Sequence, residues 1–91
     1  MSGFFYNGHL LFILYSQTLD RYYVGASGDL ERRLTKHNAN HKGYTGRASD
    51  WAIVHKERFT SKVEAYRREK QIKGWKSRRM IENLLASGHP D

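Results

Sequence analysis

The chain has 91 residues, of which sixteen are Lys or Arg and nine are Asp or Glu, so its net charge is +7. This length predicts a single domain over residues 1–91, with a core of about 10–86 and loose ends at 1–8 and 87–91. The absence of cysteine excludes disulfides and thiolate metal sites, and with neither a secretory signal nor a membrane-spanning apolar run we expect a cytoplasmic protein without membrane contact.

The first elements in chain order are predicted to be two strands that form a hairpin. Residues 10–15 are apolar at every position, as expected for a strand buried on both faces. A polar turn over 16–21 leads into a second strand over 22–25. Asp29 and Glu31 then favour the positive end of a helix dipole, which predicts a helix over 29–38.

This first predicted helix turns two polar side chains toward the interior. Its inward positions are Leu30, Arg33, Leu34 and His37, spaced i, i+3, i+4, i+7. Taken singly, His37 fits a packed or surface histidine and Arg33 a salt-bridge partner. Together on a core-facing stripe they contribute little to packing, so the pattern indicates catalysis or anion binding.

The second half of the chain predicts a loop, a strand and two helices. Residues 38–49 are rich in Gly, Asn and His and predict a loop, and residues 51–59 predict a third strand. Ser61 and Glu64 form a capping-box pattern that starts a helix running to about Gly74. A third helix covers about 76–86, before Gly88 and Pro90. The element order is therefore β-β-α-β-α-α.

Glu69 and Tyr23 are further candidates for chemistry. Ala65, Glu69 and Ile72 share one stripe of the predicted helix, which would partly desolvate the Glu69 carboxylate. Periodicity alone favours the simpler interpretation, a boundary glutamate paired with a nearby Lys or Arg. Tyr23, next to the end of the second strand, would by itself be an ordinary half-buried strand tyrosine.

The four residues together favour a specific reaction. Arg33 would clamp a phosphate, while Tyr23 and His37 would move protons or orient water. Glu69 would hold one divalent ion. This set suits hydrolysis of a phosphodiester with one Mg²⁺ or Mn²⁺, because two-metal nucleases need a cluster of acids that the sequence does not contain.

Most of the net charge lies between residues 62 and 79. A basic stripe this local indicates a polyanion partner, with nucleic acid first, either DNA or RNA, although a solvated helix face is the plain alternative. The candidate nucleic-acid-binding residues are Lys62, Arg67, Arg68, Lys70, Lys73, Lys76, Arg78 and Arg79.

Several motifs resemble those of the GIY-YIG nuclease superfamily, in particular its small single-domain bacterial branch. The resemblance covers about residues 11–85 and rests on Tyr23-Val-Gly25, the helix segment 29–37 and the segment 64–75. It implies an α+β fold with a three-stranded antiparallel sheet flanked by three helices. It also implies a metal-dependent DNA endonuclease acting in repair or recombination, with weakly sequence-specific or structure-directed cutting, or a partner protein that supplies the target.

The resemblance also implies roles for the site residues. Tyr23 would take part in activating the attacking water, and Arg33 would stabilise charge on the phosphate. His37 would place the nucleophile or the phosphate. Glu69 would ligate the metal, so the metal-ligand interpretation now outweighs the boundary salt bridge.

One position departs from the family pattern. The first half of the signature places a tyrosine about 11 residues before Tyr23, where this chain has Phe12. Tyr15 is expected to face the other side of the strand and cannot replace it. Loss of this phenol leaves an alternative function, a catalytically weak or inactive nucleic-acid-binding module on the same fold. A small domain that binds an acidic protein is a third, less favoured alternative.

Overall fold

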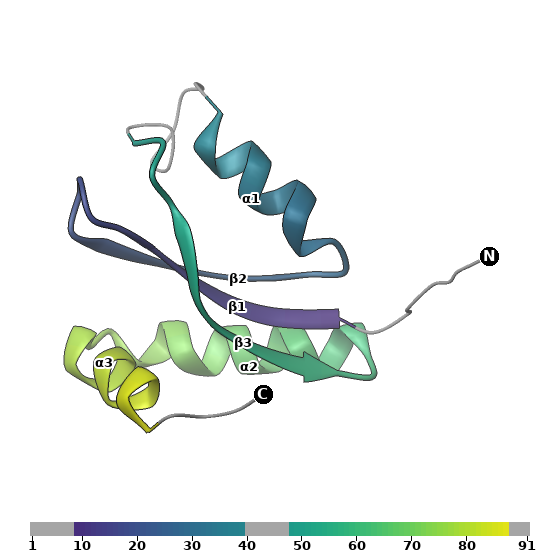
Figure 1. The fold of residues 1–91 in the computed structure, drawn as a ribbon. Helices are drawn as coiled ribbons and strands as arrows, with labels where there is room; N and C mark the ends of the chain where they lie inside the picture. Colours follow the sequence, from purple (N-terminus) through teal and green to yellow (C-terminus); the bar gives the residue numbers. More distant parts are fainter. Residues whose placement is uncertain (1–8, 40–47, 88–91) are drawn as a thin grey trace.

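The computed structural model describes residues 9–39 and 48–87. The predicted loose end 1–8, all but the first residue of the predicted loose end 87–91, and most of the predicted loop lie outside it. It confirms the predicted order and the α+β class, and each predicted boundary lies within two residues of the observed one. The elements are β1 (His9–Ser16), β2 (Arg21–Ser27), α1 (Leu30–Asn38), β3 (Ala52–Phe59), α2 (Lys62–Trp75) and α3 (Arg78–Ala86) (Figure 1).

The three strands form one antiparallel sheet in the order β2-β1-β3. Helix α1 lies on one side of this sheet, and helices α2 and α3 lie on the other (Figure 1). In the β1–β2 register, Phe12 is opposite Gly25 and Leu14 is opposite Tyr23, which places these four residues on the α1 side. None of the described helices is both long and apolar enough to cross a membrane.

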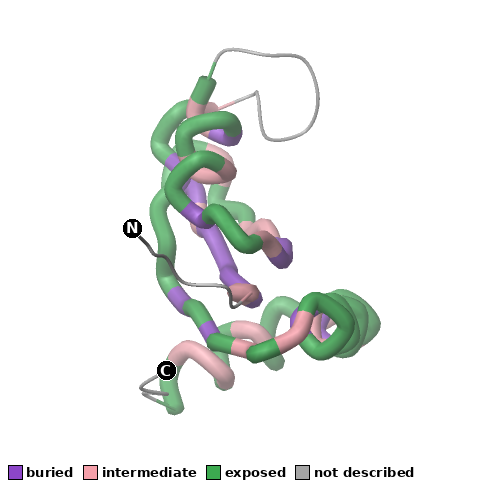
Figure 2. Tube along the Cα trace, turned by 90° about the vertical axis from the view of Figure 1, so that its right-hand side faces the viewer, coloured by how far each residue is buried: buried purple, intermediate pink, exposed green. Residues whose placement is uncertain are grey.

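Strand β1 supplies the centre of the core. Its residues 11–14 are completely buried, as the all-apolar run predicts. Leu11 and Ile13 pack with Ile72 of α2, whereas Phe12 and Leu14 pack on the opposite face. In Figure 2 the buried part of the trace runs through the middle of the molecule, between helices that are largely exposed on their outer sides.

Polar side chains define where the helices begin. The Asp29 carboxylate accepts from the Arg32 backbone N–H at 3.1 Å, and the Ser61 hydroxyl accepts from the Glu64 N–H at 3.1 Å. The second contact is one half of the predicted capping box. Helix α2 ends at Lys76, whose φ of 49° is left-handed and turns the chain into α3.

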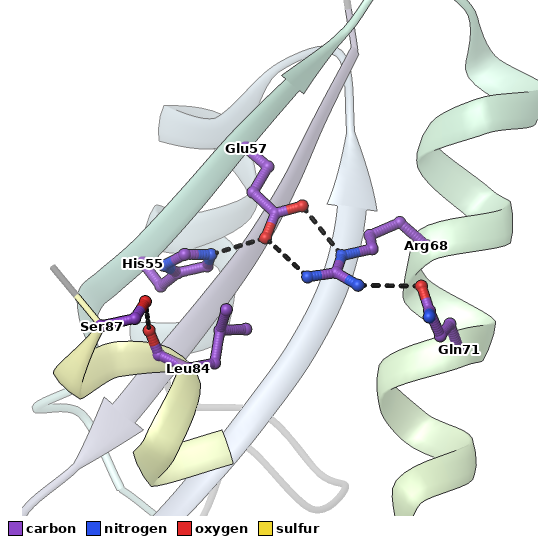
Figure 3. Close-up of polar contacts among 6 residues, drawn as sticks. All are labelled: His55, Glu57, Arg68, Gln71, Leu84 and Ser87. Carbon is purple, nitrogen blue, oxygen red and sulfur yellow. Dashed lines mark hydrogen bonds and ion pairs between the residues drawn. The ribbon is translucent and has the colours of Figure 1, made fainter. Parts of the chain in front are cut away.

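A buried ion network fastens α2 to β3 on the side of the sheet away from α1. The Glu57 carboxylate accepts from Arg68 Nε at 2.9 Å and Nη2 at 3.1 Å, and His55 Nε2 lies 2.8 Å from it (Figure 3). Arg68 also donates to Gln71 at 2.8 Å. Burial alone would raise the pKa of Glu57, but Arg68 and His55 hold that pKa below its usual value.

The first prediction concerns two glycines that differ in their surroundings. A Cβ on Gly25 would lie 2.8 Å from Cζ of Phe12, whereas a Cβ on Gly74 in α2 would meet nothing within 4 Å. Gly25→Ala is therefore expected to lower the free energy of unfolding by about 1–3 kcal/mol through overpacking. Gly74→Ala is expected to raise it by about 0.5–1 kcal/mol through helix propensity. Urea unfolding followed by tryptophan fluorescence measures both, and equal effects would contradict the close packing of Phe12 on Gly25.

The second prediction concerns the pH dependence of stability. Because folding lowers the pKa of Glu57, its contribution is fully present at neutral pH and is lost as the pH falls through the folded-state pKa. Glu57→Gln is expected to destabilise the protein by about 1–3 kcal/mol at pH 7. The difference from wild type should shrink between about pH 5 and pH 3. The control, Glu31→Gln in the exposed first turn of α1, should cost less than about 1 kcal/mol.

Candidate active site

Tyr23, Arg33 and His37, predicted as site residues, meet on the α1 side of the sheet. Nη2 of Arg33 donates to the Tyr23 hydroxyl at 3.4 Å, and Nη1 donates to the Ala26 carbonyl at 3.3 Å. The ring centroids of Tyr23 and His37 are 4.3 Å apart. Leu30 and His37 are buried and Arg33 and Leu34 half-buried, so the predicted inward face of α1 is confirmed.

Phe12 lies beside this cluster. Its ring centroid is 6.5 Å from that of Tyr23, and Cζ of Arg33 lies 5.8 Å from the centroid of the Phe12 ring. Tyr15 belongs to the other face, as expected, because its ring packs against Tyr22 at 4.9 Å and its hydroxyl donates to Asp20 at 2.6 Å. Position 12 is therefore the one next to the cluster, and it has no phenol oxygen.

Glu69 is paired with Lys73 of its own helix, and Lys73 lies near the cluster. Its carboxylate accepts from Lys73 Nζ at 2.7 Å, and that Nζ lies 5.9 Å from the Tyr23 ring centroid. The Glu69 side chain is 21% exposed. The paired boundary glutamate is thus observed, and Lys73 is the side chain that lies near both Glu69 and Tyr23. No group of three metal-ligating side chains occurs among residues 9–39 and 48–87.

The predicted nucleic-acid-binding residues fall into two groups. Three form ion pairs: Arg68 binds Glu57, Lys73 binds Glu69, and Arg78 binds both Asp20 and Glu82. The other five are exposed at the surface, with Lys62 lying 5.5 Å from the Tyr66 ring centroid, and they are Lys62, Arg67, Lys70, Lys76 and Arg79. Nucleic-acid contact at these positions stays a prediction.

Two basic residues that the sequence analysis did not select lie on the same face as the cluster. Lys56 of β3 is opposite Phe12, and Arg58 is opposite Leu10. Both are exposed, so they extend positive charge across the α1 face. Their alternate spacing in the predicted strand over 51–59 is the sequence signal that places both on one face of the sheet.

Asn38 connects the end of α1 to the start of β3 beside the cluster. Its side chain donates to the Trp51 carbonyl at 3.0 Å and accepts from the Trp51 backbone N–H at 2.7 Å. Trp51 is 3% exposed, and its ring centroid is 6.5 Å from that of Tyr23. These two bonds tie the last residue of α1, which follows His37 in sequence, to Trp51.

Comparison with known proteins identifies a matching family model. The model described as the GIY-YIG catalytic domain matches residues 8–83. The chain is 37% identical over 79 residues to a UPF0213 protein of Natronomonas pharaonis, covering 86% of this chain and 91% of that protein. It is 43% identical over 53 residues to a UPF0213 protein of Halobacterium salinarum, covering 57% of this chain and 69% of that protein.

A solved structure resembles the fold as well. The solution NMR structure of a UPF0213 protein from Bacillus halodurans matches with a TM-score of 0.58 and 30% identity. The match covers 91% of this chain and 88% of that one.

The third prediction tests the Asn38 connection. Asn38→Ala leaves the Trp51 N–H and carbonyl without these partners, so we expect the free energy of unfolding to fall by about 1–3 kcal/mol. The control is Asn83→Ala on the exposed surface of α3, which changes the same side chain in a helix without removing such a pair. Urea unfolding compares the two, and an equal change in both variants would rule out a specific role for the Asn38–Trp51 bonds.

Proposed function

Because this chain belongs to the GIY-YIG family of catalytic domains, which implies nuclease-type function, we propose that it is a metal-dependent DNA endonuclease. The observation that supports this most directly is the meeting of Tyr23, Arg33 and His37. Lys73, which binds Glu69, lies 5.9 Å from the Tyr23 ring centroid. We further propose that the enzyme hydrolyses phosphodiester bonds in DNA repair or recombination, with RNA as a second candidate substrate.

Arg33 is the proposed phosphate-binding group. Its guanidinium is held by the Ala26 carbonyl and the Tyr23 hydroxyl, so the plane of the group is fixed before substrate arrives. A guanidinium so oriented binds two phosphate oxygens at once and stabilises the negative charge that builds up on them. Neither contact partner of Arg33 is a carboxylate, so its positive charge is not neutralised by them.

Tyr23 and His37 are the proposed proton-handling groups. The Tyr23 oxygen accepts from Arg33, which directs the hydroxyl proton away from the guanidinium. The His37 ring lies 4.3 Å from the Tyr23 ring, close enough for both to act on one water or one phosphate oxygen. These two rings would therefore orient the attacking water and accept its proton.

Glu69 is the proposed metal ligand. Magnesium is often held by one or two carboxylates, with the remaining positions filled by water and substrate phosphate, so a single partly exposed carboxylate fits. A bound Mg²⁺ or Mn²⁺ would offset phosphate charge and lower the pKa of a coordinated water. Lys73 Nζ donates to the Glu69 carboxylate at 2.7 Å, so Lys73 and the metal ion would share this carboxylate.

The exposed basic residues suit binding to the DNA backbone. Lys56 and Arg58 on the α1 face, together with the exposed basic residues of α2 and α3, would contact phosphates on either side of the cut. Phosphate contacts carry no sequence information directly. We therefore propose structure-directed or weakly sequence-specific cutting, with a partner protein as the alternative source of targeting.

One observation favours a second candidate function. Phe12 occupies the position beside Tyr23 and Arg33 where the family signature has a tyrosine. A chain that lacks this oxygen and depends on it would bind nucleic acid without cutting it. The second candidate is therefore a non-catalytic nucleic-acid-binding module.

The fourth prediction separates the two functions. Purified protein is incubated with supercoiled plasmid and with flapped and branched DNA, in Mg²⁺ and in Mn²⁺. We expect wild type to cut, and Glu69→Gln to lower the cleavage rate by at least about 100-fold, because loss of a metal ligand should cost at least as much as loss of a supporting contact. The control is Glu64→Gln, which makes the same charge change in the first turn of the same helix and should leave the rate unchanged.

Phe12→Tyr completes the experiment. If wild type cuts and Phe12→Tyr changes the rate less than tenfold, Tyr23 and His37 suffice for proton transfer. If neither wild type nor Phe12→Tyr cuts any substrate while both bind DNA, the enzyme proposal is wrong and the binding module is correct. Calorimetric titration of Mn²⁺ into wild type and Glu69→Gln tests the metal site independently of cutting.

A further inference from the structure

A groove of about 340 Å³ lies between β2 and the junction of α2 and α3. Strand β2 is an edge strand, so the groove runs along the outer edge of the sheet. Its volume is within the range of about 300–1,000 Å³ that is typical of ligand sites. Neither Arg33 nor His37 lines this groove.

The groove combines an apolar floor with a cationic rim. Val24 and Ile72, which line it, are 6% and 1% exposed and therefore form its deep part, with the half-buried Tyr22 beside them. Arg21 and Lys76 line it too and are exposed, so they form the rim. A nucleotide has the matching chemistry, because its base is flat and largely apolar on its faces while its phosphate is anionic.

The groove is continuous with the proposed active site through two side chains. Tyr23 lines the groove and also accepts the hydrogen bond from Arg33. Lys73 lines the groove and binds Glu69, the proposed metal ligand. A DNA strand whose phosphate lies at Arg33 would therefore pass Tyr23 and Lys73 on its way to the groove.

We propose, on the basis of the proposed function, that this groove binds an unpaired nucleotide adjacent to the bond that is cut. The bases of intact duplex DNA are stacked and paired, and taking one out costs a few kcal/mol. A flap, branch or mismatch supplies such a base at little cost. The groove thus selects DNA by the presence of an unpaired nucleotide and not by sequence.

The cationic rim can be removed without disturbing the fold. Lys76 has a φ of 49°, a backbone conformation that favours glycine, so Lys76→Gly deletes the charge and relaxes the backbone together. Arg21→Gln removes the second rim charge at an exposed position. The matched control, Arg67→Gln with Lys70→Gln, removes two exposed charges of α2 that do not line this groove.

The test measures binding by fluorescence anisotropy in EDTA, so that it does not depend on cutting. Labelled duplexes with and without a single-nucleotide flap are the probes. Wild type should prefer the flapped duplex by about tenfold or more. The double variant Arg21→Gln/Lys76→Gly should prefer the flapped duplex by about twofold or less. The control should lose affinity for both DNAs equally and keep its preference.

Two outcomes would overturn the inference: wild type that binds both duplexes equally, or a preference that the groove variant and the control alter to the same extent. A 5-bromouracil placed at the flap gives a second measurement, because photocrosslinking should attach it to Tyr22 or Tyr23. Crosslinking elsewhere on the chain would also count against the groove. Failure of the proposed endonuclease activity appears separately, as absence of cutting in Mg²⁺ and Mn²⁺ by a protein that still prefers the flap.

Discussion

The fold depends on one constraint, the complete burial of β1 between its neighbours and the helices. Residues 11–14 have no exposed surface, so the side chains on both faces of the strand must be covered. The even-numbered Phe12 and Leu14 face α1, and the odd-numbered Leu11 and Ile13 face α2. The pairing of Leu14 with Tyr23 then places Tyr23 on the α1 side. A shift of the register by one residue would move that tyrosine to the opposite face, away from Arg33 and His37.

The second face is fixed by the ion network between β3 and α2. Arg68 reaches Glu57 on the strand, and this contact ties α2 to β3. Successive helical residues are turned by about 100°, so Glu69 points in a different direction from Arg68. Lys73, one turn after Glu69, binds it and lies 5.9 Å from the Tyr23 ring centroid on the edge strand β2. A buried ion pair adds little net stability, but loss of one partner is costly. Here the ion pair between Arg68 and Glu57 joins β3 to the helix that carries Glu69 and Lys73.

Much of this arrangement could be predicted from the sequence, for identifiable physical reasons. The apolar run of β1, the capping pattern at Ser61 and the inward stripe of α1 each give a strong local signal, and each was confirmed. The burial of His55 and Glu57 could not be predicted, because charged residues in a strand normally indicate the solvent face and only the partner Arg68, eleven residues away from Glu57, reverses that. Likewise, composition cannot distinguish Arg68 and Arg78, which bind carboxylates, from the other basic residues of α2 and α3.

Phe12 shows how the site keeps its geometry without the phenol oxygen. The ring lies against Gly25, where a Cβ would be 2.8 Å from its Cζ, and Arg33 lies over the ring at 5.8 Å. An aromatic face attracts a guanidinium whether or not it carries a hydroxyl, with a strength of about 0.5–2 kcal/mol. Position 12 therefore still holds Arg33 in place, and what is lost is one proton-carrying oxygen. In the proposed mechanism the proton transfer then belongs to Tyr23 and His37, whose rings are in contact and one of which is already hydrogen-bonded to Arg33.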